Sequence, residues 1–240
     1  GTTTGDNNIA IGASAGDAIT SGKNNVLMGK DAGGAISTGY NNTTLGNEVM
    51  PFNTDGNNNV AIGYNSGRQD PSSNNVTSPD NCVFIGFDCR ANDSTPSNQT
   101  VIGYEADGVA DNSVTLGNEN VTAVYMSHDS GATVHCAAVV EGSSLEIKTN
   151  ISEIESPLEK ISKLRGIEFD YKETDEHSIG MVAEEVNEVF PELVSKDEDG
   201  KVQAMSYSRM TAVLLEAIKE LNQEVKELKM SNIYNNKERD

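Results

Sequence analysis

Basic residues are scarce in this sequence, and their scarcity argues against several kinds of partner. The chain of 240 residues holds 17 Lys and Arg against 37 Asp and Glu, a formal net charge of −20. Only four of the basic residues precede Ser143. A surface this acidic repels phosphate backbones and anionic lipid headgroups. We therefore expect neither nucleic acid nor a membrane surface among the partners.

Long hydrophobic runs are missing too. No apolar run approaches the roughly 20 residues needed to cross a bilayer, and nothing resembles a signal peptide. We expect no membrane insertion. The chain opens on Gly1 rather than Met, so we expect it to be a piece of a longer protein.

Cysteine and histidine are few. Cys82, Cys89 and Cys136 show no CxxC spacing, and the whole chain has 3 His. A disulfide framework or a zinc site is therefore not expected. We expect incidental or buried thiols, no cofactor and no metal. Such thiols suit assembly in a reducing cytoplasm.

The chain does contain an internal repeat. A large aliphatic residue followed by glycine recurs seven times, with the glycines 17, 17, 17, 23, 17 and 14 residues apart. The pairs are Ile11-Gly12, Met28-Gly29, Leu45-Gly46, Ile62-Gly63, Ile85-Gly86, Ile102-Gly103 and Leu116-Gly117. Asparagine-rich segments precede most of them. A recurring frame of this kind indicates stacked repeat units.

Each unit is typical of a short strand with two inward aliphatic residues, such as Val60 and Ile62. The glycine then permits a positive φ or a close approach of two backbones. Two inward residues cannot bury a core, so the coils must stack, and we expect the thin solenoid to trimerise. The asparagines either form hydrogen-bonded ladders or merely tolerate turns. The six extra residues between Ile62 and Ile85 predict a protruding loop, which is either a receptor contact or an untargeted insertion.

The repeat resembles those of trimeric fibrous adhesins, including the β-roll heads of trimeric autotransporters, and those of phage tail-fibre shafts. The likeness covers roughly residues 7–118. It implies a mainly β homotrimeric fibre. We predict a shaft of stacked β-solenoid repeats of about 17 residues over 1–119 and a β-stranded stem over 120–142.

Residues 143–240 have ordinary globular composition and predict an α+β domain. We expect an amphipathic helix over 152–165 interrupted early by Pro157, a strand over 166–171 and a short helix over 184–190. A hairpin over 193–205 would turn at Asp199-Gly200. The last helix starts near Ser208 and has a coiled-coil seam with a frayed tail after Met230. The seam residues are Thr211, Leu214, Ile218, Leu221, Val225 and Leu228.

Ser143 and Lys148 are the one pair in the chain suited to covalent chemistry. A serine hydroxyl is a weak nucleophile until a base takes its proton. A lysine can be that base only where desolvation lowers its pKa. On spacing alone, a Gly-Ser linker followed by a solvated lysine is the simpler interpretation.

Three features change that interpretation. They are Ser143 and Lys148 followed by Asn150-Ile151, the run from Ile179 to Val186 continuing to Phe190-Pro191-Glu192, and Tyr207-Ser208-Arg209-Met210 entering the last helix. Together they resemble the intramolecular chaperone domain of the S74 peptidase family, found at the C-termini of phage tail spikes, tail fibres and neck appendages and in a membrane-bound eukaryotic transcription-factor family.

The resemblance implies a domain that trimerises, guides three chains into a β-fibre and then cuts itself off. It assigns Ser143 as nucleophile and Lys148 as base, with cleavage beside Gly142, Ser143 and Ser144; either flanking bond is possible. The family has Asp where Ser144 stands and Arg where Glu146 stands. Assembly could supply the burial that the lysine needs. Glu184 and Glu185 either orient the site or are solvated or salt-bridged to another subunit.

We therefore predict the C-terminal part of a viral, phage-type tail or appendage fibre: a homotrimer in the virion, assembled in the host cytoplasm. Its last domain would be a self-cleaving serine endopeptidase, acting once, without a cofactor. The alternative is a non-enzymatic trimeric adhesin that binds a host-surface glycan or protein and keeps its C-terminal cap. An enzyme acting on glycans would need a paired-carboxylate groove, and no such pair stands out in the repeat.

Overall fold

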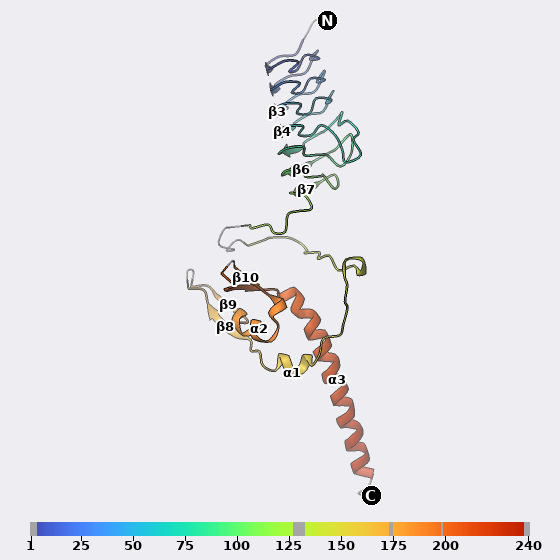
Figure 1. Ribbon diagram of the computed structural model, residues 1–240, viewed down its shortest axis with the longest axis vertical. Coiled ribbons are helices and arrows are strands. Elements are labelled where there is room, and N and C mark those ends of the chain that lie inside the picture. The colour runs from blue at the N-terminus through green and yellow to red at the C-terminus, as the bar shows by residue number, and fades with distance from the viewer. Residues whose placement is uncertain (1–3, 127–132, 173–174, 198, 238–240) are drawn as a thin grey trace. The chain divides into compact units, whose positions relative to one another are not determined.

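The computed structural model describes residues 4–126, 133–172, 175–197 and 199–237. The chain divides into two compact units, Gly1–Cys136 and Ala137–Asp240, which are described one at a time. The predicted order of a β-solenoid, a small α+β region and a C-terminal helix is confirmed (Figure 1).

The first unit is a stack of short parallel strands, one in each coil (Figure 1). Each strand pairs with the next one in the sequence, so that Ala61 lies beside Phe84 and Phe84 beside Val101. Equivalent residues of successive coils therefore stand in columns. The strands are β1 (Ile9–Ile11), β2 (Val26–Met28), β3 (Thr43–Leu45), β4 (Val60–Ile62), β5 (Val83–Ile85), β6 (Gln99–Ile102) and β7 (Ser113–Leu116).

The predicted inward direction of Val60 and Ile62 is wrong. The middle residue of the strand points into the coil, as the full burial of Leu27, Ala61 and Phe84 shows. Its two neighbours point outward because side chains alternate along a strand. All three residues of such a strand are apolar, so the pattern alone does not reveal which face turns inward.

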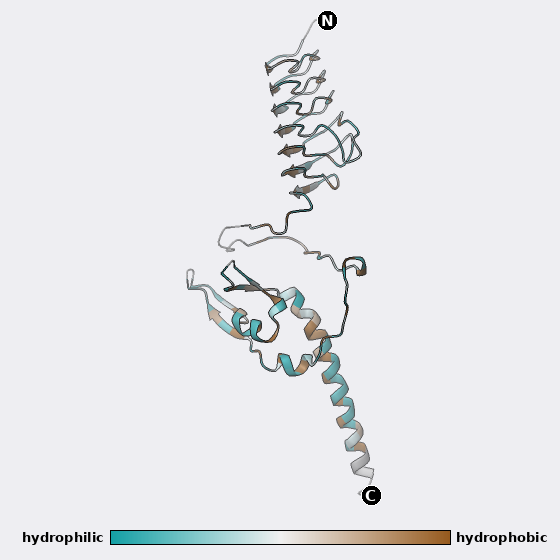
Figure 2. Cartoon of the chain, viewed as in Figure 1, coloured by the Kyte–Doolittle hydropathy of each residue, from teal (hydrophilic) through white to brown (hydrophobic). Residues whose placement is uncertain are grey.

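The outward residues form two aliphatic columns, called here the outer columns. They remain partly exposed in the single chain: Ile11 is 57% and Leu116 45% exposed. Figure 2 shows hydrophobic residues along the column of strands. The outer columns comprise Ile9, Val26, Thr43, Val60, Val83, Thr100 and Val114, and beside them Ile11, Met28, Leu45, Ile62, Ile85, Ile102 and Leu116.

The glycine after each strand is required by the stacking. Gly46 has φ +132, and a Cβ there would collide with the carbonyl oxygen of Gly63 in the next coil. Gly29 has φ +133 and meets Gly46 in the same way. Only glycine combines this backbone conformation with so close an approach, which explains why the repeat keeps it.

Both interpretations of the asparagines are correct, each for a different position of the Asn pair. The first asparagine, as in Asn24 and Asn41, adopts a positive φ near +58 and +57 and lies in an exposed ladder with a 3.3 Å Nδ2–Oδ1 bond. The second is fully buried. Asn42 donates from Nδ2 to Asn25 Oδ1 at 3.0 Å and to Gly56 O at 2.8 Å.

The middle coils depart from the regular repeat. The extra residues fold into a turn in which Asp70 Oδ1 accepts the Asn74 N–H at 2.8 Å, and the loops of these coils stand out from the strand column in Figure 1. Tyr64, Phe87 and Tyr104 stack outside the coils with centroid separations of 5.3 and 5.2 Å. This exposed aromatic stack is not apparent from the repeat pattern.

The predicted stem has no strand in its described residues, 120–126 and 133–142. Strands of an intertwined stem take their hydrogen-bond partners from other chains, which a single chain does not supply. The stem therefore stays a prediction about the assembly.

The second unit contains two antiparallel hairpins and three α-helices among its described residues. Strand β9 was not predicted from the sequence. The elements are η1 (Leu145–Ile147), α1 (Pro157–Ile161), β8 (Ile167–Asp170), β9 (His177–Gly180), α2 (Ala183–Val189), η2 (Pro191–Leu193), β10 (Val194–Lys196), β11 (Val202–Met205) and α3 (Tyr207–Lys237).

Two helix predictions need correction. Pro157 begins α1 rather than interrupting a longer helix, because proline suits the first helical position and removes a donor deeper in a helix. Helix α3 continues past Met230 to Lys237, so the tail is not frayed there.

A small core joins these elements. Val186, Phe190, Leu193, Met210 and Val213 are buried together, with residues of α1 and β11 packed around them. Helix α1 is also held by α3, because the Leu158 N–H donates to Glu220 Oε2 at 3.0 Å. No helix in the described part of the chain is long and apolar enough to span a bilayer.

The buried asparagine ladder yields a stability prediction. Asn42→Ala removes the oxygen that accepts from Asn59 N at 3.2 Å and Asn59 Nδ2 at 2.9 Å. Each buried group left without a partner costs about 1–3 kcal/mol. We expect a clear loss of unfolding free energy in denaturant titration of the purified chain.

The matched control is Asn41→Gly. Its side chain is exposed, and glycine accepts its φ of +57, so we expect a change below about 0.5 kcal/mol. Equal losses for the two variants would contradict a structural role for the buried ladder.

Candidate functional site

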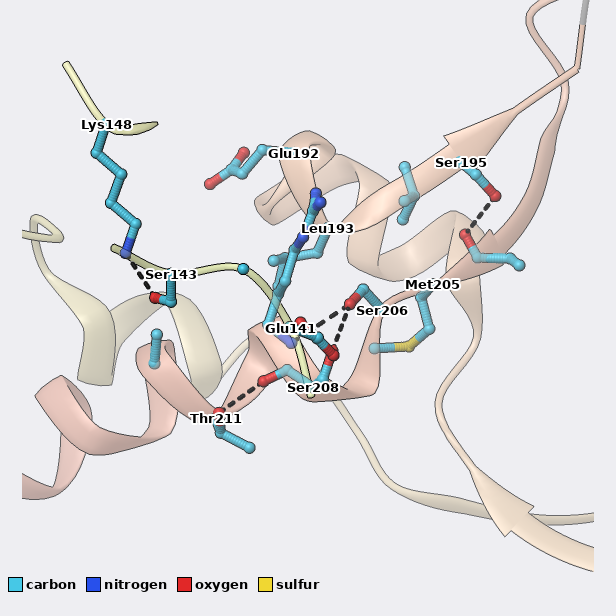
Figure 3. Close-up of a pocket in the computed structure, with 15 residues that line it drawn as sticks. Glu141, Ser143, Lys148, Glu192, Leu193, Ser195, Met205, Ser206, Ser208 and Thr211 are labelled. Carbon is cyan, nitrogen blue, oxygen red and sulfur yellow. Dashed lines mark hydrogen bonds between the residues drawn. The ribbon is translucent and has the colours of Figure 1, made fainter. Parts of the chain in front are cut away.

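Ser143 and Lys148 are in direct contact. Lys148 Nζ donates to Ser143 Oγ at 2.7 Å, as Figure 3 shows. The 3-10 turn η1 brings them together by tightening the chain between them. Its geometry is held by Glu146 N donating to Ser144 Oγ at 3.2 Å and by Lys148 N donating to Leu145 O at 3.2 Å.

This turn also places the two positions that differ from the resembled family. Ser144 occupies the N-cap position of η1, and Glu146 is in its first turn. Both side chains are exposed. The serine–lysine contact therefore forms without the family's Asp and Arg at these positions.

The pair opens onto a groove of about 1030 Å³ within the second unit. Its walls come from the segment around Ser143, from the β10–β11 hairpin and from the start of α3 (Figure 3). The lining residues are Glu141, Gly142, Ser143, Lys148, Glu192, Leu193, Val194, Ser195, Ala204, Met205, Ser206, Ser208, Arg209, Thr211 and Ala212. The walls lie far from Ser143 in the sequence, so spacing did not reveal them.

The start of α3 is fixed in place. Ser206 N donates to Leu193 O at 2.7 Å, and Ser206 Oγ accepts the Arg209 N–H at 3.3 Å, which caps the helix. The next residue, Met210, is only 3% exposed. The backbone of this wall is therefore held by hydrogen bonds and by a buried neighbour, while the side chain of Arg209 remains exposed.

Helix α3 presents two different faces. Met210, Val213 and Ala217 are buried against their own domain. The predicted seam from Thr211 to Leu228 is exposed along its whole length; Ile218, for example, is 63% exposed. The chain thus carries an apolar helical stripe that its own fold does not cover.

The charged residues of the groove form no ion pair among the residues that the structure describes. Glu141, Glu192 and Arg209 take part in none, and the side-chain ammonium of Lys148 bonds only to Ser143. Glu185 does not line the groove. It binds Arg165 at 2.7 Å, and the hydrogen bond with Arg165 lowers the pKa of the Glu185 carboxyl. This is a salt bridge within one chain.

The thiols do not extend the site. Cys82 and Cys89 are buried in the solenoid, and burial raises the pKa of both thiols. In the described part of the chain, no group of three or more His, Cys, Asp and Glu is arranged to hold a metal ion.

Residues 143–195 match the peptidase S74 family, described as the chaperone of endosialidase. The chain is also 36% identical over 94 residues to the long tail fiber protein Gp37 of Enterobacteria phage K3, covering 36% of this chain. It is 26% identical over 157 residues to Gp37 of Salmonella phage S16, covering 55% of this chain. A third relative, Gp37 of Enterobacteria phage Ox2, is 31% identical over 122 residues, which make up 47% of this chain.

The chain spans only a fraction of these relatives: 8% of the K3 protein, 21% of the S16 protein and 43% of the Ox2 protein. The matches confirm the resemblance to phage tail-fibre proteins and to the S74 chaperone domain. The family match contains both Ser143 and Lys148.

Proposed function

We propose that this chain is the C-terminal part of a phage tail fibre whose last domain guides trimer assembly and then releases itself by cleavage beside Ser143. The observation that carries the proposal is the 2.7 Å contact between Lys148 Nζ and Ser143 Oγ inside the segment that matches the S74 family. The proposed fibre is a homotrimer in the virion, assembled in the host cytoplasm.

Ring size favours the Gly142–Ser143 bond as the one that breaks. Ser143 Oγ reaches the Gly142 carbonyl carbon through a five-membered ring, whereas its own carbonyl would require a strained four-membered ring. Proximity of this kind is itself a large catalytic factor. Gly142 is sterically open, since a Cβ there would meet only Ile147 Cδ1 at 3.5 Å.

The proposed reaction has two stages. Ser143 Oγ bonds to the Gly142 carbonyl carbon while its proton passes to Lys148 Nζ. The Gly142–Ser143 C–N bond then breaks, and the nitrogen takes that proton, leaving an ester and a free Ser143 amine. Water attacks the ester carbon, and Ser143 Oγ leaves as a hydroxyl. The products are a Gly142 carboxylate and a chaperone domain that begins at Ser143.

Assembly would complete the site. Ser143 and Lys148 are both exposed in the single chain, and burial is what lowers the pKa of a lysine ammonium. Thr211 lies both in the wall of the groove and at the start of the exposed α3 seam. Helices that join along this seam would therefore meet beside Ser143 and Lys148, which links cleavage to trimer formation.

The exposed apolar surfaces of the single chain support self-association. The α3 seam has the spacing of a coiled coil, and the outer columns of the shaft carry aliphatic residues with only two threonines. These stripes contain no charged residue. An apolar stripe without charges can be covered by the same stripe of another copy, because no like charges meet along it.

A host-surface glycan or protein is the external partner that we propose for the fibre. The aromatic stack of Tyr64, Phe87 and Tyr104 is the shaft's most aromatic exposed surface, at 42%, 44% and 60% exposure. A fibre that cleaves itself and a fibre that binds a receptor are compatible.

Self-cleavage is tested by intact-mass spectrometry of wild-type protein beside Ser143→Ala, both denatured after assembly. We expect two wild-type fragments that meet between Gly142 and Ser143, and one uncut mutant chain. Removing the nucleophile leaves no hydroxyl to attack. A single uncut chain in both samples would leave the alternative, an adhesin that retains its C-terminal cap.

The dependence of cleavage on trimer assembly is tested with the double variant Leu221→Ala/Val225→Ala. Each truncated side chain removes about 1.5–3 kcal/mol of burial in every copy, so we expect loss of the trimer in native mass spectrometry and, with it, loss of cleavage. Gln223→Ala, on the opposite side of the helix, is the control and should cleave normally. Normal cleavage by a monomeric double variant would contradict the link.

A further inference from the structure

Among the donor-bearing side chains that line the groove, Arg209 is the one that makes no side-chain hydrogen bond within the described residues. The hydroxyls lining the same groove already have partners. Thr211 Oγ donates to Ser208 O at 2.6 Å, and Ser195 Oγ donates to Ala204 O at 3.5 Å. Ser206 and Ser208 share a hydrogen bond at 3.1 Å.

Lys148 is also engaged, since its ammonium binds Ser143 Oγ. Arg209 therefore brings a permanently charged, five-donor guanidinium to the groove that contains Gly142. Its backbone is anchored by the Ser206 cap, which holds the base of the side chain at the groove. Its guanidinium has no partner within the described residues that it must give up before it binds an anion.

We infer that Arg209 stabilises the negative oxygen that forms on the Gly142 carbonyl when Ser143 attacks. This inference rests on the proposed self-cleavage. As Ser143 Oγ bonds to the carbonyl carbon, the electron pair of the C=O double bond moves to oxygen, and the guanidinium donates hydrogen bonds to it. When the C–N bond breaks, that pair returns and the interaction ends.

The charges around the groove favour this role. Glu141 and Glu192 line the same groove and would repel a developing oxygen anion. Lys148 takes up a proton in the same step, yet it has to give that proton to the leaving nitrogen. Arg209 is the remaining cation of the lining, and a guanidinium keeps its charge throughout.

The test follows cleavage over time in full-length chains made by cell-free translation, with trimer content measured on the same samples. Preorganised oxyanion donors are worth about 10²–10³ in rate. We expect Arg209→Gln to form trimers and to cleave about 10²–10³ times more slowly than wild type. Arg165→Gln is the matched control, because Arg165 binds Glu185 outside the groove, and it should cleave at the wild-type rate.

Chemical rescue separates this role from a structural one. Free guanidinium ion, well below denaturing concentrations, should restore cleavage to Arg209→Ala, whereas sodium ion at equal ionic strength should not. Wild-type cleavage rates in Arg209→Gln would overturn the inference and leave self-cleavage standing. An Arg209→Ala chain that fails to trimerise, or that guanidinium does not rescue, would also overturn it. An uncut wild-type chain would remove both proposals.

Discussion

The shaft depends on one constraint: each coil must supply hydrogen-bond partners for the backbone and side-chain amide groups of the next coil. The parallel strands do this on one side, and the buried asparagines do it where the chain turns. The side-chain oxygens of Asn25, Asn42 and Asn59 accept from the coil that follows, and each amide nitrogen donates both to the asparagine of the preceding coil and to a carbonyl of the following one. Because buried polar groups without partners are costly, a coil has little stability except between neighbours.

The same constraint supports the chaperone role that we propose for the second unit. Long-range parallel pairing is slow to form and exposes strand edges during folding. The single chain also leaves its outer columns partly exposed and its α3 seam exposed, so its own fold does not cover these apolar surfaces. A domain that gathers three chains would address both difficulties, and one that leaves afterwards would not burden the finished fibre.

The sequence predicts most clearly those features that a backbone imposes. The spacing of the glycines predicted the coils, because Gly29, Gly46 and Gly63 stack so closely that none of these positions has room for a Cβ. It did not predict which strand face turns inward, since Val60, Ala61 and Ile62 are all apolar. The Ser143–Lys148 pair was visible as a spacing and as a family resemblance. The groove could not be predicted, because its walls come from residues some fifty to seventy positions away from Ser143. The contact between Glu220 and Leu158 could not be predicted for the same reason.

The column arrangement also has a consequence for inheritance. A regular coil touches only the coils directly before and after it. Two shafts that are joined at equivalent glycines would therefore still stack coil on coil. Genes for such shafts can therefore recombine at whole-coil boundaries and still encode a continuous stack. The segment from Tyr64 to Tyr104 is different, because Tyr64, Phe87 and Tyr104 stack on one another. A recombination point within this segment would separate the stacked rings, so the segment would have to be exchanged as one block.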